Sequence, residues 1–327
     1  MLTLLGLTVA SGCAEPANRG VESFGSDVRN VAFTVSVADS FALDAAEAYP
    51  VVGGWRPGEL LVYDLASSRV LYATHADVAL RTLGRSGSGP GEYRAATWLG
   101  WLEDQPAVLD PLNRRLLTFD NRGVPGPLLQ LDGGIRNIVA GTRDSLILSG
   151  RLIRGEADSV DALVRIVNGR ATRHVAIPFP ADPAGRRFAA VHAAPCGRDV
   201  IAVVRSDTAV AWLVDRGSLQ ITAARRLPAT LVRAADSDPE ATAPDPQRFH
   251  FSGVLGDASG CVVLGLTPSE SEVPEFTLYW LRTVSEPVFV GTVRTSLPLA
   301  LRQDTLFSAD GPLANGHLRI MATTVSP

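Results

Sequence analysis

The chain has 327 residues, of which 46% are hydrophobic and 20% are charged, and its formal net charge is −4. This is the composition of a globular protein that buries a core, and the negative balance excludes a strong general attraction to nucleic acid. All 30 basic residues are arginine, which excludes Schiff-base chemistry on a lysine and the lysine of a phosphate-binding loop.

The N-terminus resembles the signal peptide of a bacterial lipoprotein. Residues 2–10 form an apolar run that is too short to span a bilayer, and the small residues Ala10, Ser11 and Gly12 come directly before Cys13. In such lipoproteins the peptide is cut before the cysteine, whose thiol then carries a lipid. We therefore expect residues 1–12 to be removed, Cys13 to be lipidated, and the protein to lie in the bacterial cell envelope, facing the periplasm or the outer membrane.

The next segments predict a tether and a strand. Residues 13–30 are polar and rich in turn formers, which is typical of a flexible tether. Residues 31–37 alternate apolar and polar side chains, which predicts a β-strand. No later segment is long and apolar enough to cross a membrane. We expect residues 31–327 to form the folded domain, in contact with a membrane only through the lipid.

From there on, short segments rich in β-branched and aromatic residues alternate with turn formers, which predicts an all-β fold. A motif recurs among them. Asp64 and Arg69 in one segment correspond to Asp110 and Arg115 in another. The two aspartates are 46 residues apart, and so are the two arginines. Four strands repeating every 40 to 50 residues or so are the signature of a propeller blade. The aspartate, with Asn113 in the second copy, is expected to close the turn, and the arginine to pair with the aspartate across it.

The second copy, D-x-x-N-x-R-L-x-x-F-D-x-x-G, resembles the repeat of NHL-type six-bladed β-propellers. The preceding motif G-x-x-G-x-G-P-G-E-Y, from Gly84 to Tyr93, contains the stretch RSGSGPGEY and resembles the turn between blades in bacterial envelope propellers of that kind. The resemblance covers residues 58–123 and implies six blades. A phosphate cradle is the alternative for this stretch, but that motif needs a following helix and a lysine, and AATWLGWL follows instead.

The regular spacing of the predicted strands divides the chain from about residue 49 onward into six blades. They are predicted at about residues 49–84, 95–131, 138–179, 189–228, 251–293 and 296–324. The last blade lacks an outer strand, which residues 31–37 can supply, so that the two ends of the domain close the ring. The expected architecture is an all-β, six-bladed β-propeller closed by an N-terminal strand in the last blade.

The predicted blades place all the longer insertions on one face. The first-to-second and third-to-fourth strand turns are short, whereas residues 151–162, 180–187, 233–248, 267–275 and 309–316 fall at the other connections. Long loops on a rigid scaffold favour binding, although they can also be solvent-exposed insertions that bind nothing. We expect this face to bind a protein, peptide or glycan, and the protein to be a monomer. The tentative binding residues are Arg151, Arg154, Arg186, Arg187, Asp236, Asp238, Glu240, Glu270 and Glu272.

Two further observations leave alternatives open. Cys196 and Cys261 either pair in an oxidising envelope or are small buried residues. His192 and His250 fall near the starts of inner strands, where a central channel could hold a divalent cation. The alternative function is therefore a metal-assisted lactonase or lyase at the channel mouth. No catalytic constellation can be read from the sequence, so we expect a non-catalytic binding protein without a cofactor.

Overall fold

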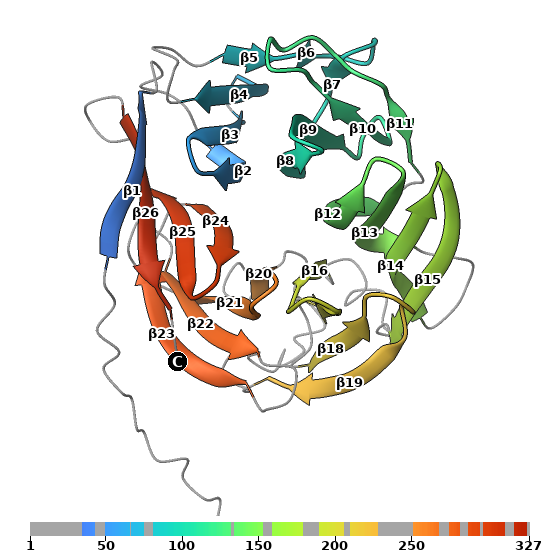
Figure 1. Ribbon diagram of the computed structural model, residues 1–327, viewed down its shortest axis with the longest axis vertical. Helices are drawn as coiled ribbons and strands as arrows, with labels where there is room; N and C mark the ends of the chain where they lie inside the picture. Colours follow the sequence, from blue (N-terminus) through green and yellow to red (C-terminus); the bar gives the residue numbers. More distant parts are fainter. Residues whose placement is uncertain are drawn as a thin grey trace, which may run out of the picture. The chain divides into compact units, whose positions relative to one another are not determined.

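The computed structural model describes residues 35–42, 50–65, 67–74, 81–131, 134–152, 159–178, 190–205, 210–227, 251–267, 275–281, 287–294, 297–310 and 317–325. These residues form six four-stranded antiparallel sheets that surround a central axis (Figure 1). No helix occurs within these ranges, and so none there could cross a membrane. The predicted all-β, six-bladed β-propeller is confirmed.

The strands of each blade are lettered from the inner strand, a, to the outer strand, d. Blade 1 consists of β2 (Pro50–Arg56), β3 (Glu59–Asp64), β4 (Arg69–Thr74) and β5 (Arg81–Leu83). Blade 2 consists of β8 (Trp98–Leu102), β9 (Gln105–Asp110), β10 (Arg115–Thr118) and β11 (Leu129–Gln130). Blade 3 consists of β12 (Ile135–Thr142), β13 (Ser145–Leu152), β14 (Ser159–Val167) and β15 (Arg170–Pro178).

The second half of the ring follows the same order. Blade 4 consists of β16 (Val191–Pro195), β17 (Val200–Arg205), β18 (Val210–Asp215) and β19 (Ile221–Arg226). Blade 5 consists of β20 (Phe251–Gly256), β21 (Cys261–Thr267), β22 (Glu275–Leu281) and β23 (Val288–Arg294). Blade 6 consists of β24 (Leu297–Arg302), β25 (Thr305–Asp310), β26 (His317–Thr324) and β1 (Val35–Ala42). Two short strands, β6 (Arg85–Ser86) and β7 (Glu92–Tyr93), lie between blades 1 and 2.

The N-terminal strand completes the last blade, as predicted. β1 runs antiparallel to β26, from Val35 opposite Thr323 to Ala42 opposite His317. The predicted end of this strand, Val37, was too early, since β1 continues to Ala42. The pairing continues past this residue because β26 offers partners as far as His317, and a bulge between Val37 and Asp39 shifts the alternation that had set the predicted end. Residues 31–34 lie outside the described ranges.

The core consists of six clusters, one between each pair of neighbouring blades. Strand β3 illustrates the reason. Leu60 and Val62 pack against blade 6, whereas Leu61 and Tyr63 pack against blade 2. Because successive side chains of a strand point to opposite faces, and here both faces are covered, the middle strands are continuous apolar runs rather than alternating ones.

The antiparallel order of each blade sorts its connections into two faces. The a–b and c–d turns leave one face, which we call the short-turn face, and the b–c and d–a connections leave the other, which we call the long-connection face. The a–b turns are residues 57–58, 103–104, 143–144, 196–199, 257–260 and 303–304. Residues 153–158, 179–190, 227–250, 268–274 and 311–316 connect strands on the long-connection face. On the short-turn face, the c–d connection of blade 2, residues 119–128, is also long, which the sequence did not predict. The c–d connections of blades 1 and 5, residues 75–80 and 282–287, have the same length as 153–158 and 311–316.

Candidate functional site

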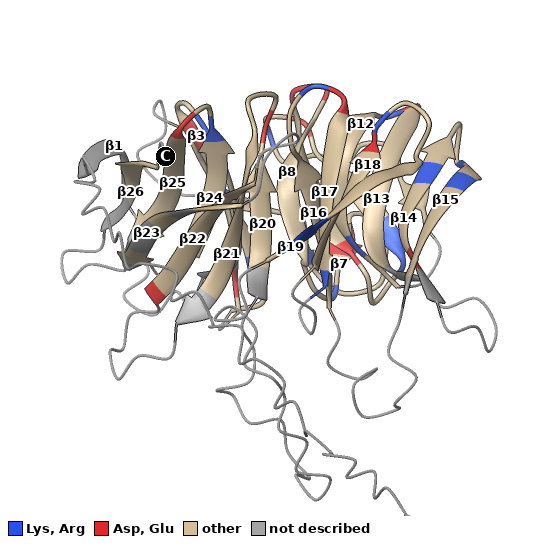
Figure 2. Cartoon of the chain, turned by 90° about the horizontal axis from the view of Figure 1, so that it is seen from below, with Lys and Arg blue, Asp and Glu red and all other residues tan. Residues whose placement is uncertain are grey.

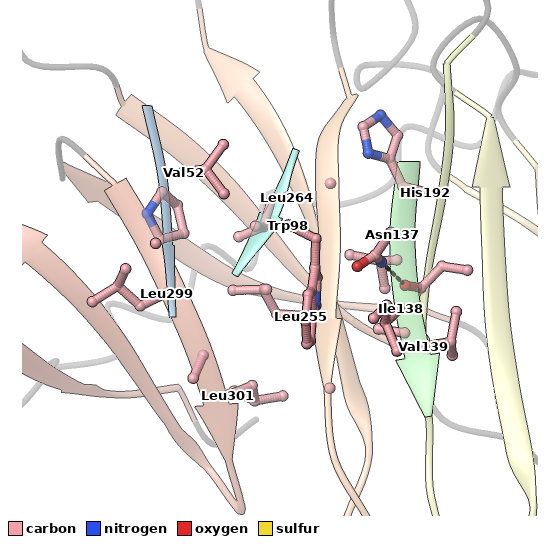
Figure 3. Close-up of a pocket in the computed structure, with 18 of the residues that line it drawn as sticks. Val52, Trp98, Asn137, Ile138, Val139, His192, Leu255, Leu264, Leu299 and Leu301 are labelled. Carbon is pink, nitrogen blue, oxygen red and sulfur yellow. Dashed lines mark hydrogen bonds between the residues drawn. The ribbon is translucent and has the colours of Figure 1, made fainter. Parts of the chain in front are cut away.

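The inner strands of all six blades enclose a cavity of about 600 Å³ on the propeller axis, which we call the axial channel. Its lining comes from β2, β8, β12, β16, β20 and β24, together with a few side chains from β21 and β22. Most of the lining side chains are Val, Leu, Ile, Ala, Pro or Gly, with Trp98 among the larger ones (Figure 3). A cavity of this volume with mainly apolar walls is the usual form of a small-molecule site.

Three polar side chains interrupt the apolar lining, and they belong to neighbouring blades. They are Thr97 beside blade 2, Asn137 on β12 of blade 3, and His192 on β16 of blade 4. His192 is the second residue of its strand, and an a strand begins at the long-connection face, so this polar edge lies toward that mouth of the channel. Figure 3 shows His192 toward one end of the channel, Asn137 nearer its middle and Leu301 toward the other end.

The polar groups differ in their hydrogen-bonding capacity. Asn137 Nδ2 donates to the backbone oxygen of Ala193 at 2.9 Å, a contact that also joins blade 3 to blade 4. The amide oxygen of Asn137 is thereby left as an acceptor facing the cavity (Figure 3). Thr97 Oγ1 is buried and has no hydrogen-bond partner among the described residues.

His192 is the one titratable side chain among the described residues that line the channel. Burial between the inner strands lowers the pKa of its imidazole from 6.5 to about 4, because the charged form loses its hydration. The imidazole is therefore neutral at pH 7 and offers one donor and one acceptor. The channel wall accordingly carries hydrogen-bonding groups and no net charge.

Glycines allow the inner strands to approach closely enough to form this narrow channel. A Cβ atom built on Gly54 would lie 2.6 Å from the backbone oxygen of Leu99 in blade 2, and one on Gly256 would lie 2.0 Å from that of Pro195 in blade 4. Gly253 differs, since the nearest atom to its Cβ would be in Leu264, 3.9 Å away. Gly253 therefore has room for a side chain, whereas the other two mark contacts between the backbones of adjacent blades.

The short-turn face is braced by contacts between successive blades, which we call the belt. Arg56 Nη1 donates to Asp104 Oδ1 at 2.8 Å and links blade 1 to blade 2. The backbone nitrogen of Arg143 donates to Glu103 Oε1 at 3.0 Å and links blade 3 to blade 2. Figure 2 shows acidic and basic residues together along this rim.

The belt continues from blade 3 to blade 4 through arginines. Arg165 Nη1 donates to the backbone oxygen of Gly217 at 2.7 Å, and Arg173 Nη1 donates to that of Ser218 at 2.6 Å. Both acceptors lie in the turn between β18 and β19. Arginine suits this use because its planar guanidinium can reach several carbonyl oxygens at once.

Blades 4, 5, 6 and 1 complete the circle. The backbone nitrogen of Gly197 donates to the backbone oxygen of Asp257 at 2.8 Å, and Asp257 Oδ2 accepts from the backbone nitrogen of Gln303 at 2.7 Å. Trp55 of blade 1 stacks on Phe307 of blade 6 with 4.2 Å between ring centroids. Each blade is thus joined to the next on the short-turn face.

A disulfide bond joins Cys196 and Cys261, whose sulfur atoms are 2.05 Å apart. Cys196 follows β16 and Cys261 begins β21, so the bond connects blade 4 to blade 5. Both residues are buried, in the cluster that fills this interface. The bond therefore adds a covalent link to the same edge of the ring that the belt braces.

The stretch RSGSGPGEY is a folded turn on the long-connection face. Three residues of the repeated Asp–Arg motif in blade 2 hold this turn in place. Asn113 Nδ2 donates to the backbone oxygen of Gly87 at 3.0 Å, Arg115 Nη1 donates to that of Ser88 at 3.2 Å, and Asp110 Oδ2 accepts from the backbone nitrogen of Arg94 at 3.0 Å.

The end of this turn is anchored in the interface of blades 1 and 2. Tyr93 is fully buried, and its hydroxyl accepts from the backbone nitrogen of Val70 at 2.7 Å and donates to the backbone oxygen of Leu83 at 2.9 Å. The N–H of Gly89, 2.6 Å from Glu92 Oε2, and the side chain of Arg85 hold the pKa of Glu92 below its usual range. The turn therefore fastens blade 1 to blade 2.

The aspartates of the repeated motif both close turns. Asp64 accepts from the backbone nitrogen of Ser67 at 3.2 Å, and Arg69 lies opposite it in the strand register. Asp110 accepts from the backbone nitrogen of Asn113 at 3.2 Å, and its Oδ2 is 3.7 Å from Arg115 Nε. The prediction of an aspartate–arginine pair across the turn understated the role of Arg115, whose main contacts reach the preceding inter-blade turn.

The other predicted site residues lie outside the described ranges. This applies to Cys13, to His250 and to the tentative binding residues Arg154, Arg186, Arg187, Asp236, Asp238, Glu240, Glu270 and Glu272. Arg151 belongs to β13, but its side chain is not described. Within the described part of the chain, no group of three or more His, Cys, Asp or Glu side chains is placed to hold a metal ion. The binding residues and the divalent cation therefore stay predictions.

Asn137 and Thr97 were missed in the sequence. Nothing in a short polar residue at the start of a strand distinguishes a channel-lining side chain from a solvated one. The inner-strand position itself was the available signal, and it did single out His192.

No family model matches the chain, and no curated protein matches it. Solved structures do. A member of the DUF4221 family from Bacteroides vulgatus is 10% identical, with a TM-score of 0.61 over 90% of this chain and 98% of the other. A protein from Bacteroides fragilis whose name marks it as a candidate exported protein is 10% identical, with a TM-score of 0.55 over 90% and 96%.

A protein of unknown function from Bacteroides thetaiotaomicron is 11% identical, with a TM-score of 0.51 over 90% of this chain and 76% of the other. At these identities the likeness shows the propeller fold and nothing further. The NHL-type character of the repeat stays a prediction.

Proposed function

We propose that this protein is a non-catalytic binding propeller of the bacterial cell envelope. In this proposal a lipid on Cys13 tethers the domain to a membrane through residues 13–30, and the long-connection face receives a protein, peptide or glycan.

The observation that carries the proposal is the difference between the two faces. The short-turn face is braced by the belt. Five of its six a–b turns take part in the blade-to-blade contacts, through Asp104, Arg143, Gly197, Asp257 and Gln303. The longest connections between strands, residues 179–190 and 227–250, belong to the opposite face. Long connections on a rigid scaffold are where binding residues concentrate.

The described part of the long-connection face also exposes large apolar side chains. Leu65 and Leu112 occupy the b–c turns of blades 1 and 2, and 51% and 58% of their surfaces are exposed. Scattered exposed apolar side chains are common, and the short-turn face exposes Val124 and Leu128 to the same extent, so these leucines do not by themselves favour either face. They are useful because they mark surface positions on known turns.

Site-specific photo-crosslinking in the native envelope tests the proposal. A photoreactive phenylalanine analogue replaces Leu65 or Leu112 on the long-connection face. The matched controls replace Val124 or Leu128, which are 56% and 52% exposed in the blade 2 connection of the short-turn face. We expect discrete adducts, identified by mass spectrometry as protein, peptide or glycan, from the first pair alone. Equal adducts from both faces, or adducts from the control pair alone, would remove the proposal.

The tether has its own test. Metabolic labelling with palmitate should mark the wild-type protein and leave the Cys13→Ala variant unlabelled. Unchanged labelling of the variant would exclude lipidation at this cysteine.

A further inference from the structure

We propose that the axial channel binds one small, uncharged and predominantly apolar molecule that carries a hydrogen-bond donor. This site is separate from whatever docks on the long-connection face, and its occupation does not require the macromolecular ligand proposed above.

The first step is the character of the walls. The cavity of about 600 Å³ is lined on all six sides by inner strands, and its described lining contains no Asp, Glu or Arg side chain. Apolar surface withdrawn from water contributes roughly 25 cal/mol per Å², so these walls favour a ligand with an apolar body. A charged group would lose its hydration there without gaining a partner of opposite charge, which costs several kcal/mol.

The second step is the placement of the polar groups. The amide nitrogen of Asn137 is occupied by the backbone oxygen of Ala193 at 2.9 Å, so its oxygen remains as an acceptor toward the cavity (Figure 3). His192 lies near it on the neighbouring blade, and Thr97 Oγ1 is buried without a partner among the described residues. An unmatched acceptor in the wall of an apolar cavity selects a ligand that carries a donor, because an unpaired buried polar group is costly.

The third step is the space available. A side chain at Gly253 would meet its nearest neighbour only at 3.9 Å, so the wall of blade 5 leaves room in the channel. The same observation supplies a way to fill the site. Leucine at this position would occupy volume that the ligand needs, without a clash at its Cβ.

A matched pair of fluorescent probes tests the proposal on the purified protein. N-phenyl-1-naphthylamine is neutral, apolar and has one N–H donor, whereas 1-anilinonaphthalene-8-sulfonate has the same ring system with a negative charge. We expect saturable binding of the neutral probe with one molecule per chain, and at least about tenfold weaker binding of the sulfonate, since burying an unpaired charge costs more than about 1.4 kcal/mol.

Two glycine-to-leucine variants locate the binding. Gly253→Leu should weaken binding of the neutral probe severalfold, since a leucine side chain would take up part of the volume of the channel. Gly217→Leu, on an exposed turn of the short-turn face, should bind it as the wild type does. Thermal unfolding checks that both variants fold.

The outcomes are separable. Absence of saturable binding by the wild type, equal affinity for the two probes, or wild-type affinity in a folded Gly253→Leu variant would each overturn the proposal. Should Gly253→Leu fail to fold, the stoichiometry and the difference between the probes in the wild type still decide it. Crosslinking from Leu65 or Leu112 is unaffected by these results, so the two proposals fail independently.

Discussion

The pH dependence of unfolding is the most direct test of the channel geometry, because His192 lies in its wall. Burial lowers the pKa of this imidazole from 6.5 to about 4 in the folded protein. Between these values the unfolded chain takes up a proton that the folded chain does not, so the free energy of unfolding falls as the pH falls. At about 1.4 kcal/mol for each pH unit, the loss from pH 7 to pH 4 is at most about 3 kcal/mol.

Urea unfolding followed by tryptophan fluorescence, at pH values of about 7, 5.5 and 4, measures this loss. The carboxylates also titrate in this range, so the informative quantity is the difference between the wild type and His192→Asn. The variant should lose less stability on acidification by at most about 3 kcal/mol. Parallel profiles for the wild type and His192→Asn would refute the burial of this imidazole.

Three further predictions concern the joints of the ring. Tyr93→Phe should lower the free energy of unfolding by about 2–4 kcal/mol in urea denaturation, because two buried backbone groups lose their partner; a loss below about 0.5 kcal/mol would contradict this. Replacing Cys196 and Cys261 together by alanine should cost about 4 kcal/mol, the loop entropy of a bond that spans 65 residues, and reduced wild type should behave like the variant. Gly54→Ala should lower stability by about 1–3 kcal/mol, since its Cβ would lie 2.6 Å from a backbone oxygen, whereas Gly253→Ala should change it little; similar thermal unfolding of the two would argue against the close approach of blades 1 and 2.

The architecture could be predicted because its determinants are local. The repeated spacing of Asp64 and Asp110 fixed the period of the blades, and the need to close the ring assigned the N-terminal strand to blade 6. The predicted end of β1 was wrong because the bulge after Val37 interrupts the alternation, and only the partner strand β26 shows that the pairing continues beyond it.

The channel could be predicted only in part. His192 was found because an inner-strand histidine is a recognisable feature. Asn137 was not, since its role depends on the backbone oxygen of Ala193 in the adjacent blade. The belt was missed for the same reason. Contacts such as Arg56 with Asp104 connect residues 48 positions apart, and no periodicity relates them.

The pairing of β1 with β26 also determines how the domain would respond to mechanical load. Val35, at the start of β1, lies opposite Thr323, near the end of β26. The two termini therefore leave the same end of this strand pair. Pulling them in opposite directions would break its hydrogen bonds one after another from that end, instead of loading all of them at once. A pull on the N-terminal segment would therefore act first on blade 6, whose outer strand it would peel away.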